Sequence, residues 1–307
     1  MNFDTPILMS GPLRRPAQLL GDQTYDGHVS VHDDAVAASL GLRGAPIEGP
    51  THFSQFDPFG VRLWGQRWFE QGCLSIHFQN MVVEGEEVQA SCSVDPTRQS
   101  PANQHQVAAV KADGTPVLAG TISIGPDVSN TELDQRRAAQ RDPGELFIID
   151  QVEVGARCDD TEPSTIDFET PNGNLYPFSL QRKLDTITEP HPWYQRNADT
   201  PWGGSVLPLE MLSVLTNKVG PRWPVRTPSL GLFLDLEVRL INGPAFADTA
   251  YLIRREVVGR SQSKRVESYW TRSTVIDPHS SAVVCEVVLH QGVFKDSYPG
   301  YPTPSIN

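Results

Sequence analysis

The feature that most constrains this chain is an internal repeat. Pro50 and Pro208 lie 158 residues apart, and so do Gly85 and Gly243. At that offset the apolar residues between the anchors coincide without a gap: Leu74, Ile76, Phe78, Val82 and Val83 fall on Leu232, Leu234, Leu236, Leu240 and Ile241. A chain of 307 residues also has the length of two ordinary domains. The sequence therefore predicts a duplicated fold with the same elements in each copy.

Each copy is predicted to combine one long helix with antiparallel strands. The Gly- and Pro-rich turn at 44–50 precedes an aromatic segment that runs to Phe69, and Pro50 suits the first turn of a helix. Pro58 is expected to break or kink this helix. From Cys73 onward, alternating and continuous apolar runs predict strands, with a hairpin turn at 112–115. Such a combination is an α+β layer.

Composition limits the partners of the protein. A formal charge of −12 and a pI near 5.1 argue against a nucleic acid or an anionic membrane, which would attract a clustered basic surface. The four cysteines form no C-x-x-C pair, which favours buried thiols in a cytoplasmic protein over a disulfide framework or a metal site. No apolar run approaches membrane-spanning length. We expect neither a metal nor a cofactor.

The order of these elements resembles the hotdog fold, in which a curved antiparallel sheet wraps one central helix. Two copies resemble a double hotdog, and the resemblance covers nearly the whole sequence. It implies an N-terminal hotdog over 1–126, a linker over 127–145 and a C-terminal hotdog over 146–307. The two sheets are expected to pair edge to edge. The ligand site is expected between the halves, near the N-terminal ends of the two helices.

Within that fold, residues 26–53 are most similar to the MaoC-like, R-specific enoyl-CoA hydratases. That family has an Asp, a His five residues later, an Ala-rich helix and an Ile-x-His-Gly turn into the central helix. Asp26 matches the Asp, residues 35–38 match the Ala-rich segment, and Ile47-Glu48-Gly49-Pro50 match the turn. The sequence departs from the pattern at three places, one of which is His28 at the position of an Asn in the family. His32 lies six residues after Asp26, and the His of the turn is replaced by Glu48 or Gly49.

The resemblance implies a hydratase or dehydratase that acts on an acyl thioester bound to coenzyme A or to a carrier protein. Asp26 and His32 would form the acid/base pair around one water, and amides at the helix start would hold charge on the thioester oxygen. An alternative stays open, in which both residues only belong to a turn and a helix cap. The expected substrate-binding residues are Gly49, Pro50, Thr51, His52, Phe53, Trp202 and Gly203.

Two other functions remain open. A hotdog thioesterase would use a carboxylate near the helix start, and Glu48 stands where it could activate water. Glu210 occupies a similar place in the second copy, where pairing of an acid with a helix N-terminus is the preferred explanation. The third possibility is a non-catalytic, repurposed hotdog protein that binds a small ligand. A homodimer is compatible with each of these.

Overall fold

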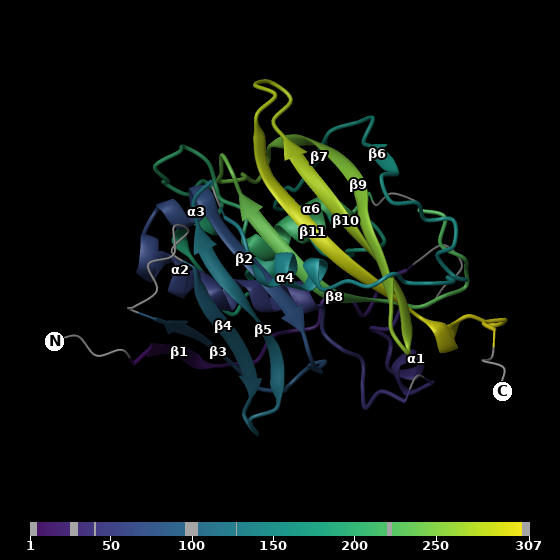
Figure 1. The fold of residues 1–307 in the computed structure, drawn as a ribbon. Helices are drawn as coiled ribbons and strands as arrows, with labels where there is room; N and C mark the ends of the chain where they lie inside the picture. The colour runs from purple at the N-terminus through teal and green to yellow at the C-terminus, as the bar shows by residue number, and fades with distance from the viewer. Residues whose placement is uncertain are drawn as a thin grey trace.

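The structure, a computed structural model, describes residues 5–24, 30–39, 41–95, 104–126, 128–219 and 223–302 (Figure 1). The strands of the first half are β1 (Ile7–Arg14), β2 (Gly72–Phe78), β3 (Val88–Val94), β4 (His105–Lys111) and β5 (Pro116–Ile124). Those of the second half are β6 (Arg157–Asp159), β7 (Ser164–Thr165), β8 (Gly231–Leu240), β9 (Ala250–Gln262), β10 (Val266–Ile276) and β11 (Val283–Phe294).

The helices are short compared with the strands. Those of the first half are α1 (Asp34–Ser39), the 3-10 helix η1 (Gly49–Phe56), α2 (Asp57–Trp64) and α3 (Arg67–Gln71). The remaining helices are α4 (Glu132–Ala138), α5 (Leu180–Leu184), η2 (Pro192–Tyr194), α6 (Leu209–Asn217) and η3 (Lys295–Ser297). The predicted break of the first central helix is confirmed, because η1 ends and α2 begins at Asp57-Pro58, with Pro58 in the first turn of α2.

One continuous sheet joins the two halves. Its strand order is β1-β3-β4-β5-β2-β8-β11-β10-β9-β6, with β7 beside β9. The joint is the antiparallel pair of β2 and β8, which runs from Cys73 opposite Arg239 to His77 opposite Asp235. Its centre is the pair of Ser75 and Glu237. The expected edge-to-edge pairing of the two halves is therefore confirmed.

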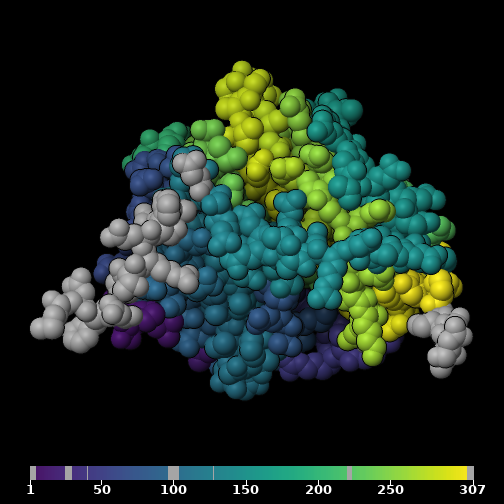
Figure 2. Space-filling model, in the orientation of Figure 1, coloured from purple at the N-terminus to yellow at the C-terminus, as the bar shows by residue number. Residues whose placement is uncertain are grey.

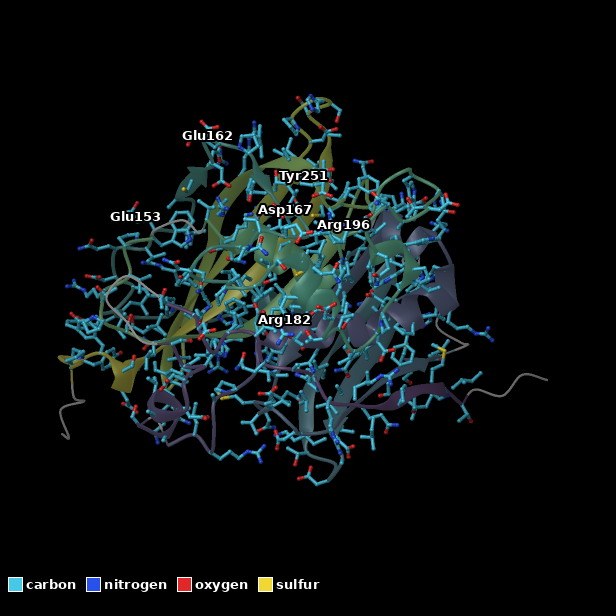
Figure 3. The ribbon with its side chains drawn as sticks, turned by 180° about the vertical axis from the view of Figure 1, so that it is seen from behind. Glu153, Glu162, Asp167, Arg182, Arg196 and Tyr251 are labelled. Carbon is cyan, nitrogen blue, oxygen red and sulfur yellow. The ribbon has the colours of Figure 1, made fainter. Side chains whose placement is uncertain are left out.

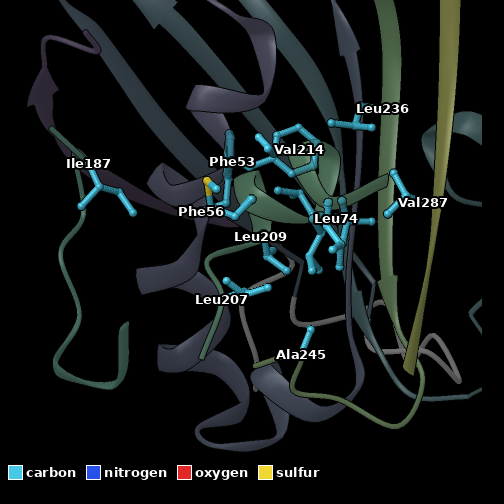
Figure 4. Close-up of a cluster of buried hydrophobic side chains, with 14 of the residues drawn as sticks. Phe53, Phe56, Leu74, Ile187, Leu207, Leu209, Val214, Leu236, Ala245 and Val287 are labelled. Atoms are coloured by element: carbon cyan, nitrogen blue, oxygen red, sulfur yellow. The ribbon is translucent and has the colours of Figure 1, made fainter. Parts of the chain in front are cut away.

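The two central helical segments, η1 and α6, contact each other and bury the same face of the sheet. Phe53 and Phe56 of η1 are fully buried in one apolar cluster with Leu209 and Val214 of α6 (Figure 4). Leu74 of β2 closes the cluster from the sheet side. Burying side chains of this size is worth about 1.5–3 kcal/mol each, so this shared core binds the halves together.

The opposite face of the joint is covered by α4, which lies in the predicted linker (Figure 1). Thr131 caps α4 and donates its hydroxyl to Glu237 Oε2 at 2.6 Å, while the Leu133 amide donates to Ser75 Oγ at 3.0 Å. These two acceptors are the central pair of the joint. Figure 2 shows teal residues of this part of the chain across the middle of the same face.

The duplication is real, but the gapless offset of 158 residues is wrong. At the start of η1, the Thr51 amide donates to the Glu48 carbonyl. At the start of α6, the Met211 amide donates to the Pro208 carbonyl in the same way, so the two helix starts are 160 residues apart. At the end of β2, the amides of Gln79 and Asn80 donate to the Val117 carbonyl. At the end of β8, the amides of Ile241 and Asn242 donate to the Val284 carbonyl in the same way, so these donors are 162 residues apart.

The wrong offset has a physical cause. Side chains of a strand repeat every two residues, so a register error of four keeps each apolar residue opposite another apolar residue. The match of Gly85 with Gly243 was a coincidence. Gly85 follows the bridge residue Val83 by two positions, and the residue that follows the bridge residue Phe246 by two is Asp248. Gly85 and Asp248 both have positive φ, at 87° and 55°.

Within the described residues, no helix has the length and apolar character needed to cross a membrane.

Candidate functional site

The turn at 46–49 leads into η1 and is fixed to the end of the first strand pair. The Ile47 amide donates to the Val82 carbonyl at 2.8 Å, and Pro46 forms a bridge with Val83. Gly49 follows under the ring of Phe78, because a Cβ at Gly49 would lie 2.8 Å from Phe78 Cζ. Only glycine fits this approach without moving the ring.

Among residues 49–51, one backbone amide has no partner in the described part of the chain. The Thr51 amide is bound to the Glu48 carbonyl at 3.1 Å, and Pro50 has no N–H. The Gly49 amide has no hydrogen-bond partner among the described residues, and Gly49 is partly exposed. Of the three residues predicted to hold a thioester oxygen, Gly49 is the one whose N–H is available for it.

His32 is held beside this turn in one tautomer. Its Nδ1 lies 2.6 Å from the Pro46 carbonyl oxygen, which can only accept, so Nδ1 carries the proton of the neutral ring. Nε2 is then a bare acceptor, and it has no partner among the described residues. Burial lowers the pKa of His32, and the hydrogen bond to Pro46 partly opposes this effect. The lowered pKa favours the neutral ring. Nε2 is therefore able to accept a proton at neutral pH.

Asp26, the expected partner of His32, lies outside the described residues. The chain on either side of it is fixed. Thr24 donates its amide to the Asn174 carbonyl at 3.0 Å, and Ser30 donates its hydroxyl to Gln23 Oε1 at 2.6 Å. The side-chain Nε2 of Gln23 in turn donates to the Leu175 carbonyl at 2.7 Å. The described residues that flank Asp26 are thus fixed to one another and to residues 174–175 of the second half.

Glu48 is the buried acid of the turn, with 6% of its surface exposed. Its Oε1 atom is enclosed and has no hydrogen-bond partner among the described residues. Burial raises the pKa of Glu48 to about 7, which the charge of Lys183 partly opposes and that of Glu210 reinforces. A carboxyl that titrates near neutral pH can serve as an acid or a base in catalysis.

Lys183 of α5 reaches the same place from the second half. Its Nζ donates to Glu210 Oε2 at 3.0 Å and to Thr51 Oγ1 at 3.2 Å. The backbone of α5 turns Arg182 outward, where it is labelled in the rear view of Figure 3, and turns Lys183 inward to 2% exposure. Nothing in the sequence around Lys183 signals this contact, which spans 132 residues to Thr51.

The other predicted residues of η1 are buried. His52 accepts from Gln55 Nε2 through Nδ1 at 3.3 Å, and burial lowers its pKa to about 4, helped by the charges of Lys111 and Lys183. His52 is thus neutral at physiological pH. Phe53 packs in the central core, and Pro50 is buried in the first turn of η1. Their predicted contacts with a substrate stay predictions.

Trp202 and Gly203 lie against α3 instead of the turn at 46–49. The Trp202 indole donates to Glu70 Oε1 at 3.1 Å and packs edge to face on Phe69, with ring centroids 6.3 Å apart. Gly203 has φ of 80° and closes a turn onto the Thr200 carbonyl. Their role in substrate binding also stays a prediction.

A search of the described residues for three or more His, Cys, Asp or Glu side chains placed to hold a metal ion finds none.

Comparison with solved structures identifies the fold. A protein from Chloroflexus aurantiacus J-10-fl, provisionally described as a MaoC domain protein dehydratase, matches with a TM-score of 0.62 and 14% identity, over 95% of each chain. A conserved hypothetical protein from Mycobacterium tuberculosis, described as having a double hotdog fold, matches with a TM-score of 0.60 and 10% identity, over 95% of this chain and 97% of that one.

Scans of the sequence against protein-family models and curated proteins give no match. Identities of 14% and 10% support a statement about fold and leave the reaction to the residues of the site. The α+β class and the pairing of two helix-and-sheet units agree with both matches. The chain therefore has the double hotdog fold and resembles a MaoC-like dehydratase in its architecture.

Proposed function

We propose that the protein is a hydratase or dehydratase of an acyl thioester carried by coenzyme A or a carrier protein. One observation supports this most strongly. His32, whose Nδ1 contacts the Pro46 carbonyl of the turn, carries an unprotonated Nε2, and the Gly49 amide of the same turn is available. A base for water and a donor for a thioester oxygen are two of the three groups that reversible hydration of an enoyl thioester requires, the third being an acid for the α-carbon.

In the direction of hydration, His32 Nε2 takes a proton from water while the water oxygen bonds to the β-carbon. The electron pair of the double bond moves to the thioester oxygen, where the Gly49 amide stabilises the negative charge. A proton then reaches the α-carbon from an acid partner, a role that the resemblance gives to Asp26. Dehydration is the reverse sequence, with the same groups in opposite roles.

The test uses crotonyl-CoA and longer enoyl-CoAs, with hydration followed by loss of the enoyl thioester absorbance. The His32→Gln variant keeps a donor for the Pro46 carbonyl and removes the base, and we expect about 100-fold lower turnover. His191→Gln is the matched control, because burial also lowers the pKa of His191 and its Nδ1 accepts from the Trp193 amide, outside the predicted site. Unchanged hydration in His32→Gln would disprove the proposed role.

A thioesterase is the second candidate, and a separate observation favours it. Glu48 combines an enclosed oxygen without a partner and a pKa near 7, as a base that activates water against a carbonyl requires. The same panel of acyl-CoAs distinguishes the two, because hydrolysis releases a thiol and hydration does not. For a thioesterase, Glu48→Gln should abolish thiol release while His32→Gln leaves it largely intact.

A further inference from the structure

The contact between the two central helices contains a group of buried charges that the hydration chemistry above does not use. Glu48 comes from the turn before η1, Glu210 from the first turn of α6 and Lys183 from α5. All three side chains are more than nine-tenths buried. Glu48 and Glu210 each have an enclosed Oε1 atom without a hydrogen-bond partner among the described residues. Such atoms are rare in folded proteins and require an explanation.

The charges of this group do not balance. One ammonium faces two carboxyl groups, and His52 beside them is neutral. The other titratable side chains that act on these groups are Asp57 of α2, Tyr194 of η2 and Lys111 of β4. Asp57 and Tyr194 interact with Glu210, and Lys111 interacts with His52. Two carboxylates that share one cation in a buried site cannot both be ionised without a large cost. One of them must hold a proton.

The geometry identifies which acid is ionised. Lys183 Nζ makes its short contacts with Glu210 Oε2 and Thr51 Oγ1. Glu48 accepts no hydrogen bond from Lys183, although it is close enough to interact with its charge. The ion pair is therefore Lys183 with Glu210, and Glu48 is the acid that keeps its proton.

We propose that Glu48, Lys183 and Glu210 form one proton-sharing centre, in which Lys183 is a positioning residue that stays paired with Glu210 and leaves Glu48 as a neutral acid for proton exchange with the substrate. This proposal rests on the proposed function, since the thioester is the group that would receive the proton. The proposal makes the second half necessary to the site, because Lys183 and Glu210 both belong to that half. Glu48 lies in the turn that carries a His in the hydratase pattern, and the centre supplies an acid there.

Two substitutions should move the titration of Glu48 in opposite directions. In Lys183→Met the cation is lost and Glu210 stays close, so the pKa of Glu48 should rise by about one unit or more. In Glu210→Gln the cation remains and its partner is neutral, so the pKa of Glu48 should fall by a similar amount. Lys183→Arg should restore the wild-type value, because it keeps the charge. Lys111→Met is the matched control, since Lys111 is also buried and paired, with Glu86, and its charge acts on His52 instead of Glu48.

The measurement is a carbon-13 NMR titration of protein labelled at the Glu carboxyl, with the Glu48 signal assigned from its loss in Glu48→Gln. The titration needs no substrate, so it tests the centre even if the protein turns over no thioester. Absence of turnover would disprove the proposed function and would not affect the centre. Where turnover is found, the alkaline limb of its pH profile should move with the Glu48 titration. A wild-type Glu48 that titrates below about pH 5, or equal values in Lys183→Met and Glu210→Gln, would overturn the centre.

Discussion

The two central helices begin differently although they occupy equivalent places in the duplicated fold. The same backbone bond closes both starts, from Thr51 to Glu48 and from Met211 to Pro208. In that register Gly49 of the first half corresponds to Leu209 of the second. Gly49 is partly exposed and keeps an available amide, whereas Leu209 is buried in the shared core (Figure 4).

The difference shows how the two copies have divided their roles. The first copy retains a glycine turn with a buried acid, Glu48, in front of it. The second copy fills the equivalent turn with proline and leucine, and its acid, Glu210, is neutralised by Lys183. Both copies keep the sheet and the helix, since these elements bury the core. The residues proposed for the chemistry, His32, Glu48 and Gly49, lie at the start of the first helical segment, and Glu210 at the start of α6 is linked to them through Lys183.

The largest expected effect concerns the buried acids of the first helical segment. Asp57 accepts from the Tyr194 hydroxyl at 2.6 Å and the Trp68 indole at 2.9 Å, and burial raises its pKa to about 7. Its pKa in the unfolded chain is near 3.8, so the native state binds the extra proton between about pH 4 and 7. Stability from this group is complete below that range and lost as the pH rises through it.

Three pKa units correspond to roughly 4 kcal/mol, which is an upper limit for Asp57. Urea unfolding between pH 4.5 and 8 should show the free energy of unfolding falling with pH. Asp57→Asn should flatten this fall, and Glu48→Gln should flatten it further. Asp150→Asn is a control, because the hydrogen bond from Arg226 lowers the pKa of Asp150, so this group acts in a more acidic range. A wild-type stability that rises from pH 5 to 8 would contradict the assignment.

The next prediction tests whether the turn at Gly49 takes part in catalysis. Gly49→Ala would place a methyl group 2.8 Å from Phe78 Cζ and disturb the available amide. We expect kcat/KM with the active thioester to fall about 100-fold, as for loss of one oxyanion donor. Gly44→Ala is the control in the same turn, because its nearest neighbour, Val83 Cγ1, would be 3.3 Å away.

A second variant separates crowding from chemistry. Phe78→Leu in the Gly49→Ala background makes room for the new methyl group. Recovery of activity in the double variant would show that the ring position matters, and continued loss would point to the amide itself. Full activity in Gly49→Ala alone would remove Gly49 from the site.

Local patterns predicted much of this fold, while the site depends on contacts that have no local pattern. The helix break at Pro58 and the hairpin turn at 112–115 follow from the chemistry of neighbouring residues. The register of the repeat did not, because period-two alternation is preserved by an even shift. Lys183 was missed because its partners, Thr51 and Glu210, lie 132 and 27 residues away.

A smaller effect tests the register by substitution at the false anchor. Gly243→Ala would place a Cβ 2.6 Å from the Phe69 carbonyl oxygen, so the backbone would have to move. We expect a loss of about 1–3 kcal/mol in the free energy of unfolding. Gly85→Ala meets open space but requires positive φ, and should cost about 1 kcal/mol. If Gly243→Ala and Gly85→Ala lowered the free energy of unfolding equally, and through backbone strain alone, the offset of 158 would be favoured.

The smallest effect concerns the true counterpart of Gly85. Asp248 has φ of 55°, where a Cβ is disfavoured, while its amide donates to the Ile166 carbonyl at 2.9 Å. Asp248→Gly keeps this bond and removes the strain, but it gives the unfolded chain more freedom, so stability should change by less than about 1 kcal/mol. Asp248→Val keeps the same bond and cannot adopt positive φ easily, so it should cost about 1–2 kcal/mol. Thermal unfolding of both variants gives the comparison. If valine is tolerated as well as glycine, Asp248 does not occupy the place that Gly85 holds in the first half.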